Sequence, residues 1–238
     1  MHTFSNKRDR NHPKLKIMLQ DKTLAFLRKL KKNNSTEWFK ENQKDYKASR
    51  TDFENFVSEI INALESIDAE IEKQDLQAKK CIKRINRDIR FSNDKSPYKT
   101  NYFANFNPDG KKSEHASYYL HLEPGNSFVG GGVYMPQTPT LNKFRREIES
   151  NLKDWKSILN STSFRKTFPN GIESPLELKT VPKGFDKESP ALEYFRMKGF
   201  YTMRKLTDKE ITSENTVTGI INNYREVKPI IEFLNRAL

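Results

Sequence analysis

The sequence predicts an α+β protein, with a central antiparallel sheet of short strands and with N- and C-terminal helices packed on it. Two observations lead to this fold class. Apolar residues recur with helical spacing near both ends of the chain, whereas residues 81–135 contain short segments in which apolar residues alternate. A chain of 238 residues with 34% hydrophobic content can bury a core. We therefore expect a single α+β domain over residues 21–238, preceded by a flexible basic segment over residues 1–20.

The N-terminal part of the domain predicts two helices. Leu24, Leu27 and Leu30 mark a short amphipathic helix, and residues 33–36 supply capping side chains for the next one. That second helix is expected to be long, because large apolar residues recur every seven positions along one face. They are Phe39, Tyr46, Phe53, Ile60 and Ile67.

The central part predicts strands near residues 81–86, 101–107, 117–123 and 127–135. The last two form the clearest hairpin. Successive side chains of a strand point to opposite faces, so Tyr118, Leu120 and Leu122 lie on one face. Val129, Val133 and Met135 of the partner strand are expected to join them there. The other face then combines aromatic side chains with glycines. Its members are Tyr119, His121, Glu123, Phe128, Gly130, Gly132 and Tyr134.

The C-terminal part returns to helix over residues 139–160 and then passes through a proline-containing irregular stretch. Ser189 and Pro190 are typical of a helix start. A strand is expected from Gly199, followed by C-terminal helices that Pro229 should kink or divide.

The charge is concentrated in two places. The net charge is +12; residues 1–17 hold five basic residues against one acidic, and residues 79–99 hold eight against two. Such asymmetry favours an anionic partner at a defined place. No apolar stretch is long enough to span a membrane, and the single cysteine, Cys81, excludes an intramolecular disulfide. We expect a cytoplasmic protein with no membrane partner, and the sequence leaves its oligomeric state open.

The segment from Arg84 to Lys99 is the strongest candidate site. Arginine presents a planar fork of donors that fits phosphate or carboxylate, and the Asp94–Pro97 stretch is typical of a turn that can present backbone amides to an anion. We expect the anion to be bound by Arg84, Arg87, Arg90, Lys95, Tyr98 and Lys99. The alternative is a structural network in which the arginines pair with Asp88, Asp94 and glutamates.

Three runs of the sequence, RDIRFSNDKSPYKT, YYLHLEPGNSFVGGGVYMP and ALEYFRMKGF, resemble the family known as domain of unknown function 2461. The resemblance covers roughly residues 20–238. It implies a family of widespread bacterial proteins with some fungal and plant members. It implies no particular activity, cofactor or catalytic residue.

Four functional hypotheses follow. The first is a site for a phosphorylated or carboxylated small molecule, with the arginines as a clamp and with Tyr119, Gly130 and Gly132 as the floor of the same concave surface; alternatively, a helix or a tyrosine ring covers the glycines. The second is single-stranded nucleic-acid binding through interleaved aromatic and basic residues. Its aromatic residues would be Phe91, Tyr98, Tyr102, Phe103 and Phe106.

The third hypothesis is an enzyme acting on a phosphorylated substrate. His121 and Glu123 share a strand face and would serve as acid and base, with Asp88 or Asp94 as a further carboxylate. The familiar ATPase, zinc-hydrolase and serine-hydrolase motifs are absent from the sequence, and we expect no metal or cofactor. The fourth hypothesis is a structural or interaction protein.

Overall fold

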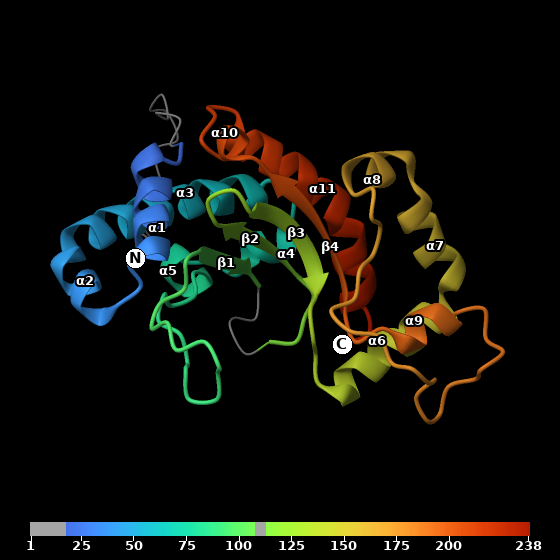
Figure 1. The fold of residues 1–238 in the computed structure, drawn as a ribbon. Helices are drawn as coiled ribbons and strands as arrows, with labels where there is room; N and C mark the ends of the chain where they lie inside the picture. The colour runs from blue at the N-terminus through green and yellow to red at the C-terminus, as the bar shows by residue number, and fades with distance from the viewer. Residues whose placement is uncertain (1–17, 108–112) are drawn as a thin grey trace, which may run out of the picture.

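A computed structural model describes residues 18–107 and 113–238 and confirms the α+β fold (Figure 1). Residues 1–17 of the expected basic segment lie outside the described residues. The helices are α1 (Asp21–Lys32), α2 (Thr36–Glu41), α3 (Gln43–Glu65), α4 (Ala69–Lys73), α5 (Ala78–Cys81), α6 (Thr138–Ser150), α7 (Leu152–Asn160), α8 (Thr162–Thr167), α9 (Leu192–Arg196), α10 (Asp208–Ile211) and α11 (Thr216–Asn235). The strands are β1 (Tyr102–Phe106), β2 (Ser117–Leu122), β3 (Ser127–Val133) and β4 (Phe200–Leu206).

The four strands form an antiparallel sheet in the order β1-β2-β3-β4. In the β2–β3 hairpin, Leu120 lies opposite Val129 and His121 lies opposite Phe128. This register gives the two faces that the alternation predicts, because residues directly opposite each other in an antiparallel pair share a face.

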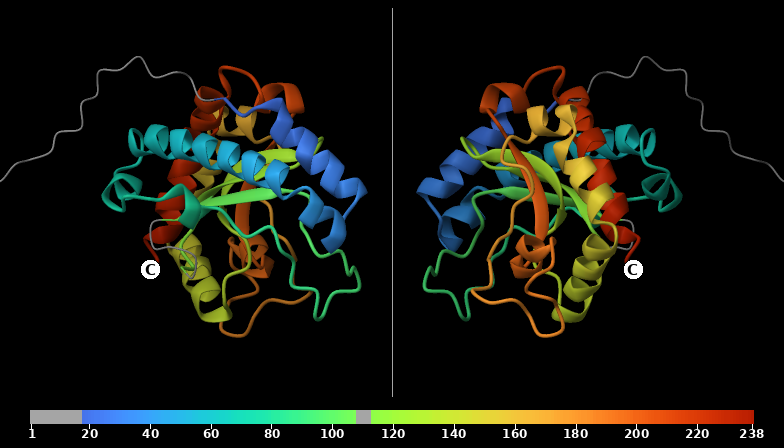
Figure 2. Two further views of the ribbon diagram at one scale, coloured as in Figure 1. Left: turned by 90° about the vertical axis from the view of Figure 1, so that its left-hand side faces the viewer. Right: turned by 90° about the vertical axis from the view of Figure 1, so that its right-hand side faces the viewer.

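One face of the sheet, here called the closed face, is covered by α3 and α11, which lie side by side (Figures 1 and 2). Leu120 and Val129 from the sheet are fully buried there with Tyr224 and Val227 from α11. Gly131 allows α11 to approach, because a Cβ at this position would lie 2.4 Å from Cγ1 of Val227. The hydrophobic core therefore lies between the closed face and these two helices.

Two predicted helices are each divided at an asparagine. The helix expected across Phe39–Ile67 is α2 followed by α3, and Asn42 between them has φ −101° and ψ 21°. The helix expected over residues 139–160 is likewise α6 followed by α7, divided at Asn151 with φ −123° and ψ 38°. Both side chains donate to a backbone carbonyl one turn earlier, at Trp38 and Glu147. Asparagine side chains that bond to the local backbone compete with the helical pattern and favour such breaks.

Other expectations are also corrected. Residues 81–86 form only two isolated bridges, Ile82 with Ala104 and Asn86 with Tyr98, because the chain leaves the sheet edge to enter a loop. The helix expected at Ser189 and Pro190 begins later, at Leu192. Helix α11 continues through Pro229 because the buried side chains on either side of the proline hold both halves against the core.

Candidate functional site

The arginine-rich segment forms a loop between α5 and β1, which we call the arginine loop (residues 84–99). Its two sides are joined by hydrogen bonds from the Arg87 amide to the Pro97 carbonyl (2.9 Å) and from the Lys99 amide to the Ile85 carbonyl (2.8 Å). At its far end, the Asp94 carboxylate accepts from the Ser96 amide at 2.9 Å, which forms the turn that the sequence predicts. The loop is therefore held by its own hydrogen bonds.

Two of the three arginines pair with carboxylates of the same loop. Arg87 donates to Asp94, and Arg90 makes two hydrogen bonds to Asp88, at 2.9 Å and 2.7 Å. The hydrogen bonds from Ser96 and Arg87 hold the pKa of Asp94 well below its usual range, and those from Arg90 lower the pKa of Asp88. In this arrangement, the guanidinium groups of Arg87 and Arg90 are occupied by Asp94 and Asp88.

The base of the loop is different. The Nζ of Lys99 donates to the Arg84 carbonyl at 2.8 Å, and its pKa is lowered by burial and by the positive charges of Arg84 and Lys83. Within the described residues, no carboxylate forms an ion pair with any of these three side chains. Lys83, Arg84 and Lys99 therefore make a region of positive charge without an ion pair among the described residues, here called the basic base; the more distant charge of Asp88 acts on Arg84.

Two other residues of the predicted anion site have local packing or hydrogen-bonding partners. The Nζ of Lys95 donates to the Ile89 carbonyl at 3.0 Å, within the loop. The ring of Tyr98 is buried and stacks on Phe39 with 3.9 Å between ring centroids. Tyr98 therefore anchors the loop to α2.

The face of the sheet opposite α3 and α11 is here called the open face. Tyr119 starts on β2, and its hydroxyl donates to the carbonyls of Gly131 on β3 and Thr202 on β4, at 3.4 Å and 3.3 Å. Its ring therefore crosses β3. A Cβ on Gly130 or Gly132 would lie only 2.0 Å or 2.1 Å from a carbonyl oxygen of β4. The glycines accordingly allow β4 to approach β3, with a tyrosine ring crossing over that strand.

A cavity of about 730 Å³ lies over the open face. Its floor and walls combine aromatic rings with polar groups, and Lys83 from the basic base reaches it. Besides Lys83, the lining residues that belong to the strands are Phe103, Asn105, Ser117, Tyr119, Phe128, Gly132, Val133, Tyr201 and Met203. Tyr134 and Met135, which are 62% and 52% exposed, also line it. Met135 was expected on the core face, but β3 ends at Val133 and the alternation of the strand does not extend to it. The cavity therefore combines aromatic rings with a lysine, a histidine and a carboxylate, from Lys83, His115 and Glu114. The Glu114 carboxylate accepts hydrogen bonds from the Gln137 amide at 2.7 Å and from the Thr140 hydroxyl.

The candidate acid–base pair lies beside this cavity. The Nε2 of His121 is 3.3 Å from Oε2 of Glu123, and the imidazole stacks on Phe128 with 4.5 Å between ring centroids. Burial lowers the pKa of His121. Burial raises the pKa of Glu123, but hydrogen bonds from Asn126, His121 and Thr100 outweigh it and lower that pKa overall.

The structure brings together some of the predicted site residues and not others. Thr100 donates to Glu123 at 3.1 Å, so the chain that leaves the arginine loop contacts the acid–base pair directly. None of the hydrogen bonds found among the described residues joins Asp88 to His121 or Glu123. Tyr119 and Gly132 line the cavity, whereas residues 84–99 do not.

Four residues at or near the cavity were not singled out from the sequence: Lys83, Asn105 and Tyr201, which line it, and Glu173, which pairs with Tyr201 at the edge of the sheet. Asn105 and Tyr201 could have been found, because each alternates with buried neighbours and so falls on the open face. Lys83 and Glu173 carry no such signal, since both lie outside the four strands.

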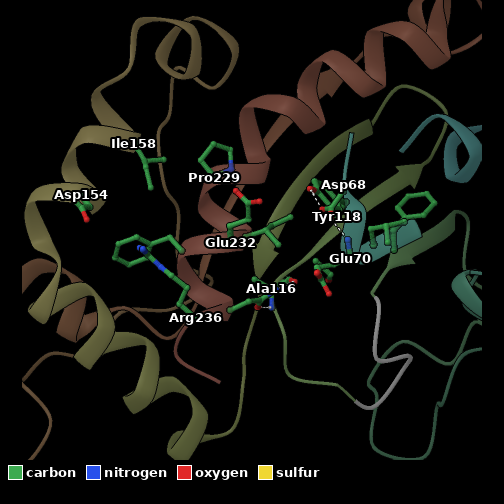
Figure 3. A pocket seen from close by; sticks show the side chains of 15 residues that line it. Asp68, Glu70, Ala116, Tyr118, Asp154, Ile158, Pro229, Glu232 and Arg236 are labelled. Carbon is green, nitrogen blue, oxygen red and sulfur yellow. Dashed lines mark hydrogen bonds between the residues drawn. The ribbon is translucent and has the colours of Figure 1, made fainter. Parts of the chain in front are cut away.

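A second cavity, of about 660 Å³, lies between α4, α7 and α11 (Figure 3). Asp68, Glu70, Asp154 and Glu232 are among its lining residues, with Arg236. One of the dashed lines in Figure 3 marks the hydrogen bond that the Tyr118 hydroxyl donates to Asp68, which is 2.6 Å long. Four carboxylates against one guanidinium make this cavity less suited to an anion than the open-face cavity, whose lining among the described residues holds one carboxylate, Glu114, and one ammonium, Lys83.

The part of the chain that the structure describes also bears on metal binding and on membrane insertion. There, no group of three or more histidine, cysteine, aspartate or glutamate side chains is arranged to hold a metal ion. Over the same residues, no helix has both the length and the apolar character needed to cross a membrane.

These features define an α+β protein whose four-stranded antiparallel sheet packs two helices on one face and bears an aromatic cavity on the other. The chain belongs to the DUF2461 family of conserved hypothetical proteins, whose model matches residues 22–233. This match confirms the resemblance seen in the three sequence runs. Neither a curated protein nor a solved structure matches the chain significantly.

Proposed function

We propose that this protein binds a small molecule that carries an anionic group, a phosphate or a carboxylate, together with a planar ring, in the open-face cavity. The observation that carries the proposal is the placement of Lys83 among the aromatic rings that line this cavity. Ligand pockets are typically apolar and aromatic concavities of this size with a few placed polar groups.

The charges of the arginine loop support the same position for the anion. Arg87 and Arg90 already pair with Asp94 and Asp88, so an anion there would have to displace a carboxylate. The basic base has no such competitor among the described residues, and it stands at the cavity through Lys83. We therefore assign the anion to Lys83, Arg84 and Lys99 instead of to Arg87 and Arg90.

The rings supply the second half of the recognition. Phe103, Phe128 and Tyr201 belong to three different strands and all line the cavity. A planar ligand can bury both apolar surface and a ring face against them. Inorganic phosphate would use only the cation, and a neutral ring would use only the aromatic surface.

Thermal unfolding with matched probes tests this. We expect phenyl phosphate and 3-phenylpropanoate to raise Tm more than phenol or inorganic phosphate at equal millimolar concentration. Replacing Lys83 with alanine should weaken both anionic probes by about tenfold, because a charge-assisted hydrogen bond is lost. The exposed Lys179→Ala change is the matched control. Absence of any shift with both anionic probes, or unchanged affinity in Lys83→Ala, would contradict the proposal.

Single-stranded nucleic-acid binding is the second candidate, and the aromatic open face favours it. Four-stranded sheets with exposed aromatics stack the bases of single strands in known modules. Of the aromatics that suggested this from the sequence, Tyr98, Tyr102 and Phe106 are buried, while Phe91 is 94% exposed. Of those five aromatic residues, only Phe91 and the partly buried Phe103 remain available for stacking on bases.

A salt series separates the two candidates. Affinity for a polyanion falls steeply with salt because counterions are released, whereas a single anion in a partly buried site is screened less. We expect phenyl phosphate binding to persist and oligonucleotide binding to vanish by moderate salt, with or without residues 1–17. Tight oligonucleotide binding at physiological salt that depends on those residues would favour the nucleic-acid function instead.

A further inference from the structure

Glu173 lies at the outer edge of the sheet, in the segment between α8 and α9. Its amide donates to the Tyr201 carbonyl at 2.7 Å, and the Tyr201 amide donates back at 3.1 Å. This reciprocal antiparallel pair places the two side chains on the same face of the sheet. Because Tyr201 lines the open-face cavity, the carboxyl of Glu173 lies on the cavity side of the sheet.

One carboxyl oxygen of Glu173 has no hydrogen-bond partner among the residues that the structure describes. This atom, Oε1, is buried. The Tyr119 hydroxyl, whose pKa is raised by burial and in part by the charge of Glu173, donates instead to the carbonyls of Gly131 and Thr202. A buried polar atom without a partner is costly, and such an atom calls for an explanation.

The surroundings of this carboxyl are tyrosines. Burial raises the pKa of Glu173. In turn, burial and the negative charge of Glu173 raise the pKa of Tyr201, and Tyr134 contributes to the same shift. Glu173 also raises the pKa of Tyr119, after burial and Tyr201. Within the described residues, no cation forms an ion pair with Glu173, so its charge is uncompensated.

We propose that Glu173 binds a hydrogen-bond donor of the ligand, a protonated amine or an N–H group, so that the ligand of the open-face cavity carries a donor as well as an anion. This inference rests on the proposed function. The donor would give Oε1 of Glu173 a hydrogen bond, and a protonated amine would also neutralise the charge of this carboxylate. Tyr119, Tyr134 and Tyr201 would surround the donor group and favour a cation through their ring faces.

The positions of Glu173 and Lys83 define the shape of that ligand. Lys83 is bonded to β1, and Glu173 is bonded to β4, at the two opposite edges of the sheet. Strands lie about 4.8 Å apart, so the axes of β1 and β4 are separated by roughly 14 Å. The two side chains therefore suit opposite ends of an elongated molecule whose ring lies over the middle strands.

Two probes that each carry a single charged end test the two ends separately. We expect 2-phenylethylamine to bind at pH 7.5 and to shift the backbone amide NMR signals of residues 173 and 201. Glu173→Gln should weaken this amine by about tenfold and leave 3-phenylpropanoate unchanged, because it removes the negative charge of the carboxylate and replaces one oxygen with an NH2 group of similar size. Lys83→Ala should do the reverse. The exposed Glu177→Gln change is the matched control in the same segment.

The outcomes separate the inference from the proposed function. If 3-phenylpropanoate binds through Lys83 but the amine does not bind, or binds equally to Glu173→Gln, the inference is overturned and the proposed function stands. If neither probe binds, both are overturned. A titration of the Glu173 carboxyl by ¹³C NMR, which needs no ligand, should give a midpoint above 4.5. A midpoint at or below that value would show that the carboxyl of Glu173 is not desolvated and would contradict the inference.

Discussion

Tyr118 and Tyr119 are neighbours on β2, yet they belong to two different parts of the molecule. Tyr118 points to the closed face, where its hydroxyl donates to the buried Asp68 at 2.6 Å. Tyr119 points to the open face, where its hydroxyl makes two long bonds to backbone carbonyls, at 3.3 Å and 3.4 Å. The closed face therefore uses its tyrosine to link the sheet to α4, and the open face uses its tyrosine as a cavity wall.

The glycines of β3 show the same division. Gly131 faces α11, and the lack of a side chain there sets the distance between helix and sheet. Gly130 and Gly132 face the other way, and there the β4 backbone occupies the space that a Cβ would need. One strand thus supports dense packing on one face and a cavity on the other, because its side chains alternate.

The largest expected effect is at Gly131. Gly131→Val should lower the free energy of unfolding by about 3 kcal/mol, because the new side chain would overlap Val227 and the Ser117 carbonyl. The control is Gly219→Ala on the exposed side of α11, where no atom lies within 4 Å of the added Cβ. That change should stabilise the helix by about 0.5–1 kcal/mol. Urea unfolding monitored by circular dichroism measures both, and a neutral Gly131→Val would refute the tight closed face.

The two tyrosines give the next largest difference. Tyr118→Phe should cost about 1.5–3 kcal/mol, since a buried hydrogen bond to a carboxylate is lost and Asp68 keeps an unsatisfied oxygen. Tyr119→Phe should cost less than about 1 kcal/mol, because its bonds are long. The same denaturation experiment compares them. Equal costs would mean that the two faces contribute alike to stability.

The smallest effect is expected at Glu173, and it depends on pH. The folded-state pKa of Glu173 is raised above 4.5, so the ionised carboxyl opposes folding above that range and costs nothing when both states are protonated. Glu173→Gln should therefore raise Tm slightly at pH 7, and this gain should disappear as the pH falls below about 4.5. A gain in Tm that is the same at every pH would show that charge is not the cause.

Much of the fold could be predicted from the sequence. The alternation of Tyr118 to Leu122 and of the glycine-containing strand after it predicted both faces and their register, because a strand can hide its apolar residues in only one way. Helices α1 and α11 could be predicted from the helical spacing of their apolar residues, because that spacing places them on one face that must be buried. The breaks at Asn42 and Asn151 did not, since asparagine side chains can also point to solvent within a helix.

The candidate site divides along the same line. Local sequence determined that a basic, turn-containing segment would exist and that Tyr119 and Gly132 would share a face, because both features depend on neighbours only a few residues away. Tertiary structure alone decided that Arg87 and Arg90 pair with Asp94 and Asp88 while Lys83 reaches the cavity. It also brought Glu173 beside Tyr201, 28 residues further along the chain. Such pairings depend on which distant segments the fold brings into contact, and neither composition nor periodicity predicts these contacts.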